Sequence, residues 1–135
     1  MRYDFPIAYV RELRIRCDKI GVKSTPDFWK TSPLRLTEVF NEIGPEHWCP
    51  QFEKLVKYLV EPFFVAALQH DWEASRPYKS WSAFTAMNLR FIYNALQEAI
   101  EQKTLKLVFM GILLAMLCQL FGYKTYLQTF IPEEK

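Results

Sequence analysis

The sequence predicts an all-α protein: a bundle of five or six helices with a central antiparallel helix pair, in a single domain over residues 1–135. Three observations support this fold class. Apolar side chains recur at offsets of three and four residues in successive segments, as they do on one face of a helix. Proline and glycine separate these segments, and no alternating run indicates a strand. Half of the residues are apolar, which is enough for a sizeable core.

The first helices are indicated by their end signals. Pro6 suits the first turn of a helix and Gly21 suits its end. This helix carries several arginines, which we expect to be solvated. Residues 22–31 are predicted to form a loop. Ser32 is expected to cap the next helix, with Pro33 in its first turn.

The later segments follow from proline breaks and capping residues in the same way. We expect a short helix from Pro50, a break at Glu61-Pro62, and a helix from about Pro62 to Ala74. Ser80 can cap a long helix that runs to about Gln102, and Thr104 can cap a last helix that ends near Gly122.

The dipeptide His70-Asp71 places two ionisable side chains in an otherwise apolar segment. Burying an imidazole beside a carboxylate costs free energy unless each group has a partner. On a helix Asp71 is turned by about 100° from His70, so we expect the two side chains to serve separate roles. Asn88 interrupts the apolar stripe of the following long helix, and antiparallel packing would bring it opposite His70. The pair is either a core hydrogen bond that sets helix register or part of a reactive site.

These elements resemble the helical pair of the phospholipase A2-like family, over about residues 43–96. Ala66-Ala67-Leu68-Gln69-His70-Asp71 is similar to the His-Asp helix of that family, and the segment 86–91 is similar to its antiparallel partner. Ile43-Gly44-Pro45 is similar to the calcium-binding loop of its disulfide-free viral members. The chain is also similar to small phage and prophage proteins of unassigned function, which close with Leu-Phe-Gly, as at Leu120-Phe121-Gly122.

The resemblance implies a catalytic site and a metal. His70 would be the general base that activates a water against an ester, with Asn88 in the place of the acid that orients this histidine in the family. Asp71 and the loop at Gly44 would bind Ca²⁺, which would stabilise the oxyanion. Outside this enzyme hypothesis, no cofactor is expected.

The segment Leu107–Phe121 is almost continuously apolar. It is shorter than the roughly 20 residues of a typical membrane span, contains Gln119, and lies between Lys106 and Lys124. A central core helix or a dimer interface is the favoured interpretation, and membrane insertion is the alternative.

Composition narrows the remaining functions. A formal net charge of +2 gives no reason to expect a nucleic-acid partner. The three cysteines form no CxxC pair, which favours reduced thiols in a cytoplasmic protein. The sequence therefore favours a noncatalytic, phage-type helical protein that acts by association with a protein partner or as a homodimer. A calcium-dependent esterase using His70 and Asp71, and a membrane-associated protein using Leu107–Phe121, are the alternatives.

Overall fold

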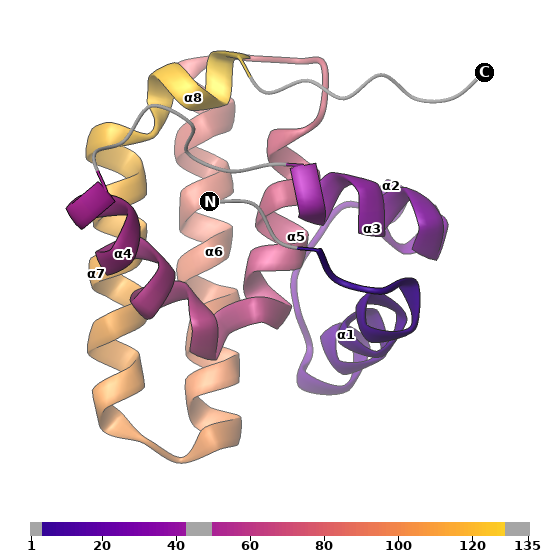
Figure 1. Ribbon diagram of the computed structural model, residues 1–135, viewed down its shortest axis with the longest axis horizontal. Coiled ribbons are helices and arrows are strands. Elements are labelled where there is room, and N and C mark those ends of the chain that lie inside the picture. The colour runs from indigo at the N-terminus through magenta and orange to yellow at the C-terminus, as the bar shows by residue number, and fades with distance from the viewer. Residues whose placement is uncertain (1–3, 43–49, 129–135) are drawn as a thin grey trace.

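The computed structural model describes residues 4–42 and 50–128, and these form helices with no strand among them (Figure 1). The helices are α1 (Ile7–Ile20), α2 (Pro26–Lys30), α3 (Pro33–Glu42), α4 (Pro50–Val60), the 3₁₀ helix η1 (Glu61–Phe63), α5 (Phe64–Ala74), α6 (Trp81–Gln102), α7 (Leu105–Phe121) and α8 (Tyr123–Gln128). The predicted all-α class is confirmed. Among the described helices, none combines the length and apolar character needed to cross a membrane.

Capping residues explain where several helices begin. Ser80 Oγ accepts a hydrogen bond of 3.0 Å from the backbone N–H of Ala83, which satisfies a free donor in the first turn of α6. Ser32 Oγ likewise accepts a hydrogen bond of 3.2 Å from the backbone N–H of Arg35, in the first turn of α3. At α7 the predicted side-chain cap is wrong. Thr104 occupies the capping position, but its hydroxyl donates to the carbonyl of Gln102 at 3.1 Å.

Two segments differ from their predicted form. The predicted loop at residues 22–31 contains the short helix α2, because its Phe28 is fully buried against the ring of Trp72, 5.5 Å away between centroids. A five-residue helix is not stable alone, so this tertiary burial decides its structure. The helix predicted from Pro62 begins as the 3₁₀ turn η1 and becomes α-helical at Phe64.

Helix α5 lies between the two larger apolar clusters of the described core. On one side Val65, Leu68 and Trp72 pack with α1, α2 and α3. On the other side Ala66 packs with residues of α4, α6 and α7. Figure 1 shows the same arrangement, with α1 to α3 on the side of α5 away from α7. Because α5 is covered on both faces, polar side chains on it must find partners within the protein.

Helix α6 is shared by two antiparallel pairs. We expected the helices of His70 and Asn88 to form the central pair, but α6 packs most extensively on α7 and next on α5. Gly111 explains the close approach of α7, because a Cβ atom there would lie only 3.1 Å from the Cβ of Ala95. The missing side chain thus allows the α6–α7 hairpin to be the larger pair.

Candidate functional site

The predicted meeting of His70 and Asn88 is present between α5 and α6. His70 Nε2 lies 2.9 Å from Asn88 Oδ1. The two positions are opposed because the short connection between the helices makes them antiparallel neighbours. The His70 side chain is only 15% exposed, and its ring meets Phe91 edge-on at 5.1 Å between centroids. The imidazole is therefore held by a hydrogen bond and an aromatic wall.

The helix angle predicted separate roles for His70 and Asp71, but in the structure the two side chains approach each other. Asp71 Oδ1 lies 3.8 Å from Nδ1 of His70, within ion-pair distance, and the Asp71 side chain is 21% exposed. The Cβ atoms of neighbouring helix residues diverge by about 100°, but both side chains have rotatable bonds that bring their ends together. Asp71 and Asn88 therefore flank the two nitrogens of one ring.

The hydrogen bonds continue from α6 to α7. Asn88 Nδ2 donates to Gln119 Oε1 at 2.7 Å, and Gln119 Nε2 donates to Thr85 Oγ1 at 3.0 Å. We call this chain of Asp71, His70, Asn88, Gln119 and Thr85 the polar latch. It joins three helices across an apolar core, where unpaired polar groups would be costly.

The direction of these bonds determines the protonation of His70. Because the Asn88 amide nitrogen donates to Gln119, its oxygen faces the ring and Nε2 must carry a proton. Nδ1 then faces the carboxylate of Asp71, which favours a second proton there. Burial lowers the pKa of His70, but Asp71 and Asn88 outweigh it, and the pKa lies above its ordinary value. Burial raises the pKa of Asp71 more than His70 lowers it.

This arrangement does not suit a general base. A base needs a nitrogen lone pair aimed at the proton that it removes. Nε2 of His70 is occupied by Asn88, and Nδ1 is directed at Asp71. Calcium takes six to eight oxygen ligands from carboxylates, carbonyls and water. Within residues 4–42 and 50–128, no group of three or more His, Cys, Asp and Glu side chains is placed to hold a metal ion. Gly44, the other predicted calcium ligand, lies outside the described residues.

The sequence did not predict that Glu98 of α6 is buried and hydrogen-bonded. It is 1% exposed, and its Oε1 accepts a hydrogen bond of 2.5 Å from the backbone N–H of Ala66 in the first turn of α5. It thus caps a helix whose own capping position, Phe63, has no side-chain acceptor. Burial raises the pKa of Glu98 to about 7. The signal in the sequence is its position seven residues after Phe91, on the apolar stripe of α6.

Other polar contacts complete the α5–α6 interface. Arg90 binds Glu73 through two hydrogen bonds, of 2.8 and 2.6 Å. Asn94, which is fully buried, donates to Gln69 at 3.3 Å and pairs with both backbone groups of Lys23. Among the described residues no buried side-chain nitrogen or oxygen lacks a partner. This interface is thus a satisfied structural network, which sets helix register.

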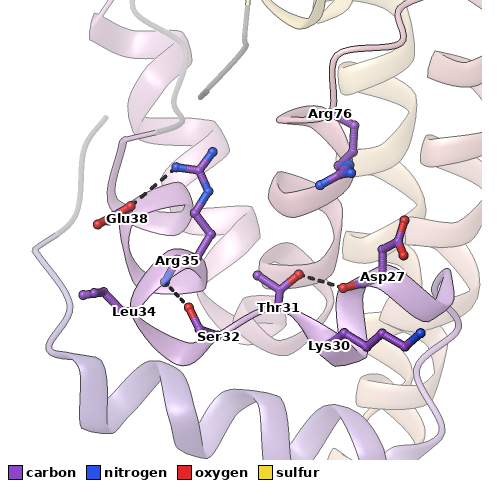
Figure 2. A pocket seen from close by; sticks show the side chains of 8 residues that line it. All are labelled: Asp27, Lys30, Thr31, Ser32, Leu34, Arg35, Glu38 and Arg76. Carbon is purple, nitrogen blue, oxygen red and sulfur yellow. Dashed lines mark hydrogen bonds and ion pairs between the residues drawn. The ribbon is translucent and has the colours of Figure 1, made fainter. Parts of the chain in front are cut away.

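A polar pocket of about 510 Å³ lies away from the latch, beside α2 and α3 (Figure 2). Its charged lining residues are Asp27, Lys30, Arg35, Glu38 and Arg76. Arg35 and Arg76 lie on opposite sides of it in Figure 2, and Arg35 bonds Glu38 at 3.4 Å. Three cations against two anions nearly balance, which favours neither an anionic nor a cationic ligand.

Helix α7 presents an apolar face that no other described element covers. We call it the α7 stripe, and its members, which are 37–72% exposed, are Leu105, Phe109, Ile112, Leu113, Met116 and Leu120. The opposite face of α7 packs on α6 through the buried Gly111, Leu114 and Ala115. Contiguous exposed apolar patches are uncommon on monomeric soluble proteins, and larger ones occur at contact sites for proteins, membranes or ligands.

Comparisons of the chain with protein-family models, with curated proteins and with solved structures give no match. The resemblance to phospholipase A2-like and phage proteins therefore stays a prediction. The class of molecule that the fold and site define is a helical bundle with an internal polar network and an apolar helix face that no other described element covers.

Proposed function

We propose that this chain is a noncatalytic helical protein that acts by association, with the α7 stripe as its contact surface. The observation that supports this proposal best is the exposure of six large apolar side chains on one face of one helix. At offsets of 4, 7, 8, 11 and 15 residues they follow the spacing of a helix that packs on another helix. Leaving such a face in water costs free energy, which binding would recover.

The polar latch supports the same function, because it holds the buried side of α7 against α6. Gln119 ties α7 to Asn88, and through it to His70 of α5, at 2.7 and 2.9 Å. These bonds fix the rotation of α7, because its polar side chain has partners in one orientation only. The α7 stripe is consequently held outward, and a rigid, preformed surface binds with a smaller entropic cost.

The calcium-dependent esterase is the weaker hypothesis. Both nitrogens of His70 are engaged, and Asn88 is a neutral amide that donates its protons elsewhere. Hydrolysis of an ester substrate that depends on Ca²⁺, and that is lost in His70→Phe, would overturn the noncatalytic proposal.

The direct test is a charge placed at the middle of the α7 stripe. Leu113→Glu introduces a carboxylate at an exposed position, so the fold should be kept while association is lost. Ile15→Glu is the matched control, since Ile15 is 57% exposed on α1. The readouts are sedimentation velocity and the fluorescence of an apolar dye, on the wild type and both variants.

Two results would support the proposal: a wild-type oligomer that Leu113→Glu dissociates, or a wild-type monomer with dye binding that this variant removes. Equal behaviour of wild type and Leu113→Glu in both assays would overturn it. Flotation with phosphatidylcholine vesicles that depends on Leu113 would also overturn it, because the stripe would then be a membrane-surface contact.

A further inference from the structure

The α7 stripe is symmetric about its own midpoint. The residue numbers in the pairs Leu105 and Leu120, Phe109 and Met116, and Ile112 and Leu113 are equally spaced from a point between 112 and 113. Burial is symmetric around the centre: Gly111 and Leu114, which flank the central pair, are both buried, whereas all six stripe residues are exposed. Farther out, Ala115 is buried and its counterpart Met110 is half-buried. A face of this form is self-complementary under a two-fold rotation.

Charge and position also favour a second copy of this face as the partner. No charged residue occurs between Lys106 and Lys124, so two copies of this face would meet without opposed like charges. In an antiparallel arrangement, Lys106 of one helix would lie opposite Gln119 of the other helix. In Figure 1, α7 lies at one edge of the molecule, where a second copy could approach it.

The size of the stripe is close to what a dimer needs. Along the helix axis it extends over about 22 Å, at 1.5 Å per residue. Its six side chains present on the order of 600 Å² of surface per protomer, compared with about 800 Å² per partner in a standard interface. A modest rim around the stripe, including Phe121, which is 57% exposed, would supply the remainder.

We infer that the partner of the α7 stripe is a second copy of this chain, with the two α7 helices antiparallel across a two-fold axis between Ile112 and Leu113. Phe109 of one protomer then faces Met116 of the other, and Leu105 faces Leu120. This inference rests on the proposed function, of which it specifies the partner and the geometry.

A charge-pair experiment tests the geometry. Phe109→Glu and Met116→Lys each place one charge against an apolar partner, and each alone should weaken the dimer about tenfold or more. In the double variant an antiparallel pair brings opposite charges together twice, so dimerisation should recover toward the wild-type dissociation constant. In a parallel pair the same substitutions would bring like charges together, and the double variant would be the weakest. The dissociation constants come from sedimentation equilibrium, and circular dichroism confirms that each variant is folded.

Failure of this inference is distinct from failure of the proposed function. A wild-type dimer whose double variant is weaker than both single variants would overturn the antiparallel geometry. A wild type that stays monomeric while its dye binding depends on Leu113 would overturn self-association, but would leave the α7 stripe as an association surface for another protein. Recovery in the double variant, with Ile15→Glu remaining dimeric, is the result that we expect.

Discussion

Glu98 should make the stability of this protein depend on pH, and Glu98→Gln should remove that dependence. Burial raises the pKa of this carboxyl from 4.5 to about 7 in the folded protein. The folded state therefore holds the proton more tightly than the unfolded state. Its contribution to stability is fully present below pH 4.5 and is lost as the pH rises through about 7.

The difference between these two pKa values corresponds to about 3 kcal/mol of unfolding free energy. Glutamine has nearly the same shape, stays neutral, and retains an oxygen that can accept the Ala66 N–H bond. Between acidic and mildly alkaline pH, the free energy of unfolding of the wild type should consequently fall by about 3 kcal/mol more than that of the variant. His70 and Asp71 also have raised pKa values, but they titrate in both proteins and cancel in the comparison.

The assay is urea unfolding followed by circular dichroism at a series of pH values. Glu12→Gln is the matched control, because it neutralises an exposed carboxylate on α1 that does not contribute to the pKa of Glu98. A difference between wild type and Glu98→Gln that does not change with pH would refute the reasoning. Such a result would mean that burial does not raise the pKa of the Glu98 carboxyl, even though this group accepts a hydrogen bond from Ala66.

Three further outcomes are expected. His70→Phe and Asn88→Leu should each cost about 1–3 kcal/mol, because each leaves a latch partner unpaired, and the double variant should cost less than their sum in urea unfolding. Additive costs would argue against the latch. Gly111→Leu should lower stability by at least 1–3 kcal/mol, since the space beside Ala95 is filled, and an unchanged urea midpoint would contradict the close α6–α7 packing. Burial raises the pKa of both Cys17 and Cys118 to about 12, so peptide mass spectrometry should find their alkylation at pH 8 far slower in the native protein than in urea. Equal rates would show that these thiols are accessible.

Local signals predicted much of the architecture. Gly21 ends α1 with a φ of 77°, and Ser80 caps α6, as expected from residue type alone. The meeting of His70 and Asn88 was predicted from one polar interruption on each of two helices joined by a short connection. Such features are readable because they depend on neighbours within a few residues, or on the simplest packing of adjacent helices.

Other features required contacts between distant segments. Helix α2 exists because Phe28 is buried against Trp72, forty-four residues away in the chain. Glu98 looks like an ordinary charged residue near the end of a helix, and only the position of α5 makes it a cap. Gln119 likewise completes the polar latch only because α7 packs on α6.

The sequence by itself determined that the chain is helical, where most helices begin and end, and which two polar residues oppose each other. Periodicity and capping chemistry act over one or two turns, so they are written in consecutive residues. Only the tertiary structure decided that His70 is enclosed by Asp71 and Asn88, and that one face of the apolar segment Leu107–Phe121 is left exposed. An apolar run shows that a helix will avoid water, but which of its faces is covered depends on the number and position of its neighbours.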